Sequence, residues 1–229
     1  MVTLGETEPD FEAQGFAVIP HVMDDAACDL IAGNLEALEM AAAGSRRLLE
    51  QRWCAELARR LRAHARIAPL LPRGAVAVQC TFLAKTPTRN WLVALHQDLS
   101  IPVRERVASE CCSGWSEKEG QLFVQAPEVV LSELIAVRLH VDECPADSGA
   151  LRVVPGSHVL GRLDPKDAER IRNERGERVV PVGRGGVLAM RPLLLHASSK
   201  AARPHVRRVL HFLFGPRELS LGLRWKAVV

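Results

Sequence analysis

Short runs in which apolar and polar residues alternate fill most of the chain after residue 74, and this pattern restricts the fold more than any other feature. The runs are rich in β-branched residues and are split by Pro, Gly, Asp and Ser; they span 75–84, 91–96, 134–141, 150–154, 178–182, 186–191 and 207–214. A period of two places alternate side chains on one face of a strand, where they can cover a core. The sequence therefore predicts a mainly β body over residues 74–229.

Two helices are predicted before this β body. Residues 24–43 carry apolar side chains at helical spacing, and either Asp24 or Asp25 is available to cap the start. A second amphipathic helix is expected to be capped by Ser45 and to stop before Pro69. We therefore expect residues 1–73 to form an N-terminal helical layer.

The chain length and one long gap complete the predicted organisation. A chain of 229 residues is long enough for one domain with a large core, so we expect a single domain over residues 1–229. The gap at 99–133 contains CCSGWSEKEG and no clear strand pattern. A loop this long inside a compact domain usually has a function, so we expect it to form a lid that contains a helix.

Charge and composition argue against several classes of protein. The 30 Lys and Arg against 27 Asp and Glu give a net charge of +3, and the basic residues are scattered, so a nucleic acid partner is not expected. No apolar run approaches the ~20 residues of a membrane-spanning helix, and the acidic N-terminus lacks the features of a secretory signal. The 6 cysteines show no C-x-x-C spacing, which favours reduced thiols. We expect a cytoplasmic protein without a membrane partner.

A histidine and an aspartate stand two residues apart at the end of an apolar run, WLVALHQD. Residues i and i+2 of a strand share a face, so His96 and Asp98 can reach one metal ion together. A carboxylate buried there is costly unless a cation or a hydrogen-bond network compensates it. The same spacing recurs at His140 and Asp142, so the pattern alone is weak evidence, and a hydrogen-bonded surface pair is its ordinary alternative.

A third ligand is available far along the chain. His196 follows the apolar residues of RPLLLH, and Arg207 comes eleven residues later. Two histidines and one carboxylate with open positions suit non-haem Fe(II) oxygenases, although zinc hydrolases use the same ligand types. The residue types therefore predict a metal site at His96, Asp98 and His196.

Several stretches resemble one protein family. WLVALHQDLSIPV, VRLHVDECPADSGALRVVPGSH and GVLAMRPLLLHASS with RRVLHF are similar to the phytanoyl-CoA dioxygenase family of Fe(II)/2-oxoglutarate oxygenases. FEAQGFAVIPHVMDDAACDLI resembles the opening strand and helix of that family, so the resemblance extends over nearly the whole chain. It implies a double-stranded β-helix, a jelly-roll relative of the cupins, with iron at one open end.

The resemblance also implies roles for individual residues. His96, Asp98 and His196 match the catalytic iron ligands of the family. Arg207 matches the arginine that pairs with the far carboxylate of 2-oxoglutarate, and an arginine suits this role because its planar fork binds a carboxylate through two hydrogen bonds. Ser198 matches a hydroxyl that assists Arg207 or the distal histidine in holding the cosubstrate.

Other residues stay open as alternatives. A shift of one residue in strand register would exchange Arg207 for Arg208, and Arg203 is a further candidate for 2-oxoglutarate. The second pattern, at 140–142, matches a hairpin of the family that carries no ligand. His211 is expected to be a packed or hydrogen-bonded core residue.

One polar strand face is a candidate for the cosubstrate pocket. Gln79, Thr81 and Lys85 share one face of the run 75–84, and we select Gln79 as a contact to 2-oxoglutarate. A solvated strand face is the ordinary alternative for such a polar stripe.

The function implied by the resemblance is that of a dioxygenase. It would use Fe(II), 2-oxoglutarate and O2 to hydroxylate a small molecule, and it would release succinate and CO2. A catalytically silent, cupin-like metal sensor is one alternative, and an oxygen-independent isomerase or hydrolase with the same ligands is another. Neither the substrate nor the use of a CoA thioester follows from the sequence.

Overall fold

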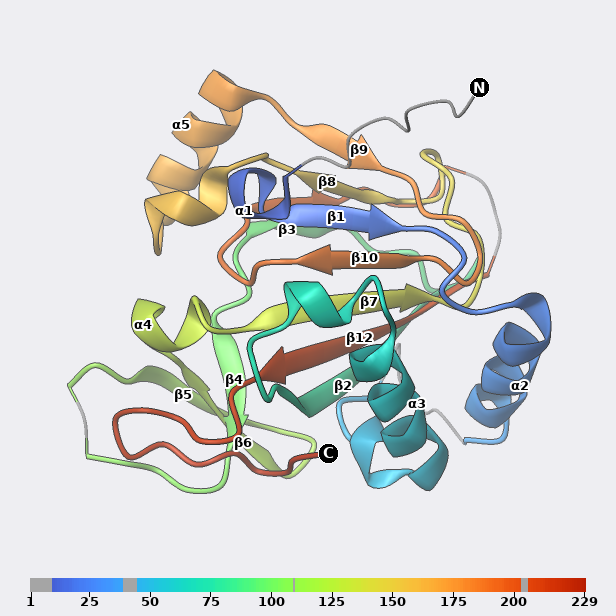
Figure 1. The fold of residues 1–229 in the computed structure, drawn as a ribbon. Helices are drawn as coiled ribbons and strands as arrows, with labels where there is room; N and C mark the ends of the chain where they lie inside the picture. Colours follow the sequence, from blue (N-terminus) through green and yellow to red (C-terminus); the bar gives the residue numbers. More distant parts are fainter. Residues whose placement is uncertain (1–9, 39–44, 109, 203–205) are drawn as a thin grey trace, which may run out of the picture.

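The computed structural model describes residues 10–38, 45–108, 110–202 and 206–229, and two antiparallel sheets dominate it (Figure 1). The five-stranded sheet has the order β1-β10-β7-β12-β2, formed by Phe16–Ile19, Val187–Met190, Ile135–His140, Arg207–Gly215 and Val76–Lys85. The four-stranded sheet has the order β3-β11-β8-β9, formed by Val93–His96, His196–Ser198, Leu151–Val153 and Arg178–Val180. Every run predicted as a strand is a strand, with ends shifted by a few residues at most.

The chain passes between these two sheets as a jelly roll requires. Apart from residues 99–133, whose strands form a separate sheet, the chain from β2 onward alternates between the larger and the smaller sheet, with β8 and β9 as consecutive strands of the smaller one. Side chains of both sheets meet in one apolar cluster, which includes Leu188 and Met190 from the larger sheet and Val153 from the smaller. The predicted double-stranded β-helix is confirmed.

Strand alternation gives the larger sheet two different faces. In β7, Val137 and Leu139 pack in the cluster that the N-terminal helices share, whereas Arg138 lies on the opposite face, toward the smaller sheet. Because the side-chain period is two, one strand supplies both the helix-covered core and the space between the sheets.

Two helices cover the outer face of the larger sheet. The first, α2 (Asp25–Glu36), is capped by the Asp24 side chain, which accepts a hydrogen bond from Ala27 N at 2.8 Å. It ends earlier than predicted, and residues 39–44 lie outside the described residues. Cys28, Ile31 and Leu35 face the sheet.

The second helix, α3 (Arg52–Ala63), begins later than expected. A 3-10 turn at Leu48–Glu50 precedes it, and no side chain caps its start, so the prediction that Ser45 caps it is wrong. Ser45 instead contacts the five-stranded sheet, because its carbonyl accepts a hydrogen bond from the backbone N–H of Phe82 in β2 at 2.7 Å. This contact joins residues far apart in the sequence, so helical spacing cannot reveal it.

The segment 99–133, expected to be a lid loop with a helix, is mostly a third sheet. Its strands are β4 (Ser100–Val103), β5 (Ser113–Lys118) and β6 (Gln121–Gln125) in the order β4-β6-β5, and the short helix α4 (Glu128–Leu131) follows. Figure 1 shows this sheet beside the C-terminal segment, and Trp225 packs in the same apolar cluster. Strand β5 is largely polar and its residues are exposed or half-buried, so it lacks the alternation that marks a strand in the sequence.

The remaining elements are short or were not predicted. They are α1 (Phe11–Gln14), α5 (Pro165–Arg175) and 3-10 turns at Ala68–Leu70 and Ser157–Leu160. The start of α5 carried a readable signal, since Asp164 caps it and a proline occupies its first turn. Within the described residues, no helix has the length and apolar character needed to cross a membrane.

Candidate metal centre

The two predicted histidine ligands come from neighbouring strands. His96 closes β3 and His196 opens β11, and antiparallel pairing sets them directly opposite each other. Their ring centroids are 4.2 Å apart. Asp98 follows β3, where its backbone N–H donates to the carbonyl of Pro192 at 2.9 Å and so holds the turn against the loop before β11.

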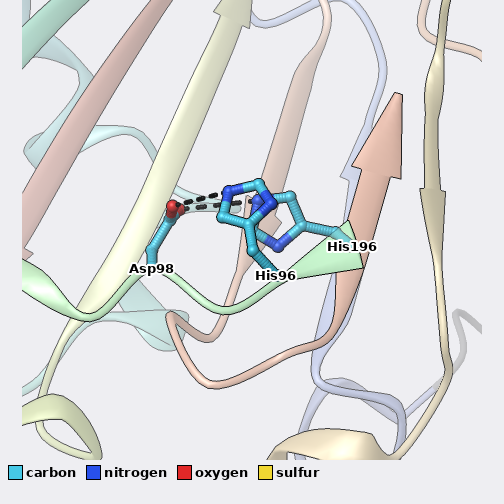
Figure 2. A group of neighbouring side chains, drawn as sticks. All are labelled: His96, Asp98 and His196. Carbon is cyan, nitrogen blue, oxygen red and sulfur yellow. Dashed lines mark ion pairs between the residues drawn. The ribbon is translucent and has the colours of Figure 1, made fainter. Parts of the chain in front are cut away.

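These three side chains converge on one point (Figure 2). Nε2 of His96 lies 3.4 Å from Oδ1 of Asp98, and Nε2 of His196 lies 3.7 Å from Oδ2. One donor atom from each residue fits within 4.8 Å of the other two, the spacing expected around a single metal ion. In the described part of the chain, no other group of histidine, cysteine and acidic side chains meets this criterion.

Hydrogen bonds orient both imidazoles for metal binding. The Nδ1–H of His96 donates to the carbonyl of Ala94 at 2.8 Å, and that of His196 donates to the carbonyl of Leu194 at 2.9 Å. A carbonyl can only accept, so Nδ1 carries the proton and Nε2 keeps its lone pair toward Asp98. Oδ2 of Asp98 is buried with no hydrogen-bond partner, which a bound cation would satisfy. The donor set therefore fits a divalent metal ion.

The charges at the centre agree with this role. Burial raises the pKa of Asp98, but the nearby imidazoles, chiefly those of His196 and His96, lower it by more, so the pKa lies below its ordinary value. Burial lowers the pKa of His196 to about 4, partly offset by the charge of Asp98. At neutral pH, Asp98 is thus an anion and His196 a neutral imidazole, which are the forms that bind metal.

The candidate metal centre opens into a cavity of about 430 Å³ between the two sheets. Gln79, Thr81 and Lys85 on β2 line it, so this polar stripe is a cavity wall and not the solvated face weighed as its alternative. Gln79 donates through Nε2 to the Thr81 hydroxyl at 2.8 Å.

Arg207 and Arg208 project to opposite sides of β12. Arg207 is 3% exposed, lines the cavity and donates through Nη1 to the carbonyl of Gly149 at 2.7 Å. Arg208 forms ion pairs with Asp142 at 2.8 Å and Glu36 at 2.9 Å, away from the cavity. The strand register is therefore the one in which Arg207 reaches the pocket, while Arg203 lies outside the described residues.

Lys85 and Ser198 meet beside Arg207. Lys85 is 1% exposed, and its ammonium donates to the Ser198 hydroxyl at 2.9 Å and to the carbonyl of Ser199. Burial, and next the charge of Arg207, lowers the pKa of Lys85 to about 8. Gly149 packs beside this contact with a φ of 69°, and an added Cβ there would lie 2.6 Å from the Ser199 carbonyl oxygen. A larger residue at position 149 would therefore displace the carbonyl that Lys85 binds.

The second His-x-Asp pattern has a different environment. Asp142 pairs with Arg208, and His140 is buried on β7 with neither ring nitrogen hydrogen-bonded. Burial lowers the pKa of His140 well below its ordinary value, and the charges of Arg138 and Arg207 lower it further, so His140 is neutral. These residues do not join the three metal-ligand candidates.

His211 and Arg138 lie closer to the candidate metal centre than the sequence indicated. His211 is hydrogen-bonded, as expected, but it is half-buried and lines the cavity, with Nε2 3.9 Å from Oδ2 of Asp98. Arg138 donates through Nη1 to Nδ1 of His211 at 2.7 Å. A signal for His211 was present in the sequence, since alternation places it on the same strand face as Arg207.

The fold and the site together define a class of protein. A jelly roll that brings two histidines and one carboxylate to a cavity has the architecture of mononuclear non-haem iron enzymes. The family model described as phytanoyl-CoA dioxygenase (PhyH) matches residues 11–209, and the chain belongs to this family. Fe(II) and 2-oxoglutarate are the cofactors of this family, so family membership confirms the predicted cofactors.

Solved structures share this fold at low sequence identity. The non-haem alpha-ketoglutarate-dependent carbocyclase SnoK from nogalamycin biosynthesis matches with a TM-score of 0.67 and 14% identity, covering 91% of this chain and 82% of that one. The epimerase SnoN in complex with Fe3+, alpha-ketoglutarate and nogalamycin RO has a TM-score of 0.67, 16% identity and coverages of 96% and 92%. HygX from Streptomyces hygroscopicus, with nickel and 2-oxoglutarate bound, has a TM-score of 0.62, 20% identity and coverages of 90% and 84%. No curated protein sequence matched the chain.

Proposed function

We propose that this protein is an Fe(II)- and 2-oxoglutarate-dependent oxygenase that hydroxylates a small molecule, with His96, Asp98 and His196 as its iron ligands. The observation that carries the proposal is the convergence of their donor atoms within 4.8 Å at the wall of the cavity. The buried and unsatisfied Oδ2 of Asp98 supports it, because such an atom is costly without a cation. When bound, Fe(II) and 2-oxoglutarate supply the activation of O2, with succinate and CO2 as products.

The residues around the cavity would hold and orient the cosubstrate. Arg207 is a buried guanidinium, which can bind the far carboxylate of 2-oxoglutarate through two parallel hydrogen bonds. Lys85 is its cross-strand partner and adds a second positive charge. Ser198 holds the Lys85 ammonium in place, so we assign it a supporting contact. Gln79 keeps its amide oxygen available beside Thr81 and remains the proposed third polar contact.

The three strands β4, β5 and β6, here called the lid sheet, would close the cavity. Ser100, Ile101 and Phe123 of β4 and β6 line it together with the metal centre. Apolar side chains there would exclude water from the bound cosubstrate. We therefore propose that the segment 99–133 acts as a lid, in the form of a sheet.

Binding measurements test the cofactor assignment first. Calorimetry without oxygen should show one Fe(II) per chain, and 2-oxoglutarate should bind to the Fe(II) protein. Once a substrate is supplied, O2 consumption should match succinate production. A protein that binds metal without 2-oxoglutarate would be a sensor or an oxygen-independent enzyme, and the proposal would be wrong.

Oxidative cyclisation or epimerisation is the second candidate, because the relatives SnoK and SnoN are described as a carbocyclase and an epimerase. Product mass in the presence of labelled O2 separates the outcomes. Hydroxylation adds one labelled oxygen atom, cyclisation removes two hydrogens, and epimerisation leaves the mass unchanged. A product without labelled oxygen would contradict hydroxylation and leave the cofactor assignment intact.

A further inference from the structure

Three buried cations face the cavity without an acidic partner. Lys85 is 1% exposed, Arg138 6% and Arg207 3%, and all three line the cavity. Their hydrogen bonds go to hydroxyl, carbonyl, thiol and imidazole groups, and in the described part of the chain none forms an ion pair with a carboxylate. A buried charge needs a counter-ion, so these side chains mark positions for anions.

The three cations occupy two separate positions. Lys85 and Arg207 are cross-strand neighbours on β2 and β12 and form one of them. Arg138 lies on β7, opposite His211, and its Nη1 donates to Nδ1 of that histidine at 2.7 Å. Nε2 of His211 is 3.9 Å from Oδ2 of Asp98, so a single imidazole separates Arg138 from the metal ligands.

Counting charges shows which cations the proposed cofactors would leave unbalanced. The two positive charges of Fe(II) would be balanced by Asp98 and one carboxylate of 2-oxoglutarate, and the second carboxylate would balance Arg207. His140 is neutral, and Asp98 is the one acidic residue among the cavity-lining residues. The charges on Lys85 and Arg138 then remain. Lys85 is the cross-strand neighbour of Arg207 and lies beside the proposed site of the second carboxylate, so Arg138 is the unbalanced cation near the metal-ligand candidates. Its Nε has no hydrogen-bond partner, so part of the guanidinium is free to bind a ligand.

We infer that Arg138 binds the acid group of the substrate, and that the substrate is a small organic acid oxidised close to its carboxylate. The inference rests on the proposed function and adds a substrate class to it. Proximity to the metal follows from the Arg138–His211–Asp98 contacts. A cavity of about 430 Å³ lies toward the small end of ligand pockets, so it suits a compact acid beside 2-oxoglutarate.

The test uses matched acids and amides as probes. Wild-type protein loaded with Fe(II) and 2-oxoglutarate without oxygen is titrated by calorimetry with phenylacetate and phenylacetamide, and then with cyclohexanecarboxylate and its amide. Each acid should bind more tightly than its amide by roughly 10- to 100-fold, the effect of a charge-assisted hydrogen bond. Arg138→Gln should abolish the preference and change the 2-oxoglutarate dissociation constant less than about threefold. Arg184 lies outside the cavity and pairs with Asp29 of α2, so Arg184→Gln should keep the preference.

Three results would overturn the inference. Equal binding of acids and amides to the wild-type protein would exclude an anion site for substrate. A loss of 2-oxoglutarate affinity of about tenfold or more in Arg138→Gln would assign Arg138 to the cosubstrate and leave the proposed function standing. Absence of 2-oxoglutarate binding to the wild-type Fe(II) protein would remove the proposed function and the inference together.

A second variant keeps the test decisive if Arg138→Gln does not fold. Arg138→Lys retains the buried charge but loses the planar fork, so it should reduce the preference for acids without changing 2-oxoglutarate binding. An unchanged acid preference in Arg138→Lys, together with weaker 2-oxoglutarate binding, would contradict the inference.

Discussion

The space between the two main sheets has an apolar end and a polar end, built from the same strands. The apolar end contains Phe16, Ala136, Leu151, Val153, Val180, Val182, Leu188, Met190 and Leu194. The polar end is the cavity, with the metal-ligand candidates and the three buried cations. Strand β7 contributes to both, since Ala136 packs in the apolar cluster and Arg138, two residues later, lines the cavity.

Within one fold, the apolar end provides stability and the polar end provides the candidate functional site. The apolar end holds the sheets together by removing hydrocarbon from water. The polar end leaves buried donors and acceptors unsatisfied in the ligand-free protein, namely Oδ2 of Asp98 and Nε of Arg138 and Arg207. Such groups reduce stability until a ligand satisfies them, which is typical of functional sites. Substitutions at the apolar end should therefore lower the free energy of unfolding and leave ligand binding unchanged. Substitutions at the polar end should weaken ligand binding more than they affect folding.

The largest effect is expected from a metal-ligand candidate at the polar end. His96→Ala should abolish stoichiometric Fe(II) binding, because two protein donors remain where three converge. His140→Ala should keep it, since His140 lies outside the cluster. Metal analysis after anaerobic loading measures both. Loss of iron in the His140 variant with retention in the His96 variant would move the site to β7.

A change at the apolar end should affect folding alone. Met190 is fully buried, so Met190→Ala should lower the free energy of unfolding by about 2 to 5 kcal/mol, measured by urea denaturation. The folded variant should bind Fe(II) and 2-oxoglutarate normally. Val179→Ala, at a position 42% exposed, is the control and should change stability by less than about 0.5 kcal/mol. A large loss of cosubstrate affinity in the Met190 variant would show that the two ends are not independent.

Arg207 should affect cosubstrate binding more than folding. Removing one partner of a buried, hydrogen-bonded charge pair costs about 2 to 5 kcal/mol, so Arg207→Leu should raise the 2-oxoglutarate dissociation constant roughly 30-fold to a few thousand-fold. Iron affinity should change little. Arg208→Leu is the matched control on the other strand face, and calorimetry without oxygen compares the two. Normal binding by both variants would place 2-oxoglutarate recognition elsewhere.

Cosubstrate binding should also weaken as the pH rises. Lys85 has its pKa lowered to about 8 in the ligand-free cavity, and its charged form, present below that pH, is the one that favours a carboxylate. The 2-oxoglutarate dissociation constant should therefore increase roughly tenfold between about pH 7 and pH 9. Lys85→Met should bind more weakly and lose this dependence. A flat profile in the wild-type protein would argue against a Lys85 contact.

The smallest effect is expected at the lid sheet. If it closes over bound ligands, amide exchange in β5 and β6 should slow by about a fewfold when Fe(II) and 2-oxoglutarate are added. Exchange in β10, at the apolar end, should not change and serves as the internal control. Equal exchange in β5 and β6 with and without ligands would mean that the lid sheet is a static wall.

The sequence predicted the site and the main strands to different extents. Alternation located every strand of the two main sheets except β1 and β11, the first of which the family resemblance implied. It also separated Arg207 from Arg208, because neighbouring residues of a strand face opposite sides. Strand β5 was missed because it is mostly polar and none of its residues is fully buried, and α5 was missed although its cap residues were present.

What the sequence by itself determined is local: the period of two, the face on which each side chain lies, and the residue types able to bind a metal and a carboxylate. The tertiary structure alone decided which faces meet. His96 and His196 are a hundred residues apart in the chain and become neighbours only through the pairing of β3 with β11, as Arg138 and His211 do through the pairing of β7 with β12. Strand pairing depends on contacts across the whole chain, whereas periodicity reports a strand's own environment, so alternation marks an inner face without showing which part of it encloses the cavity.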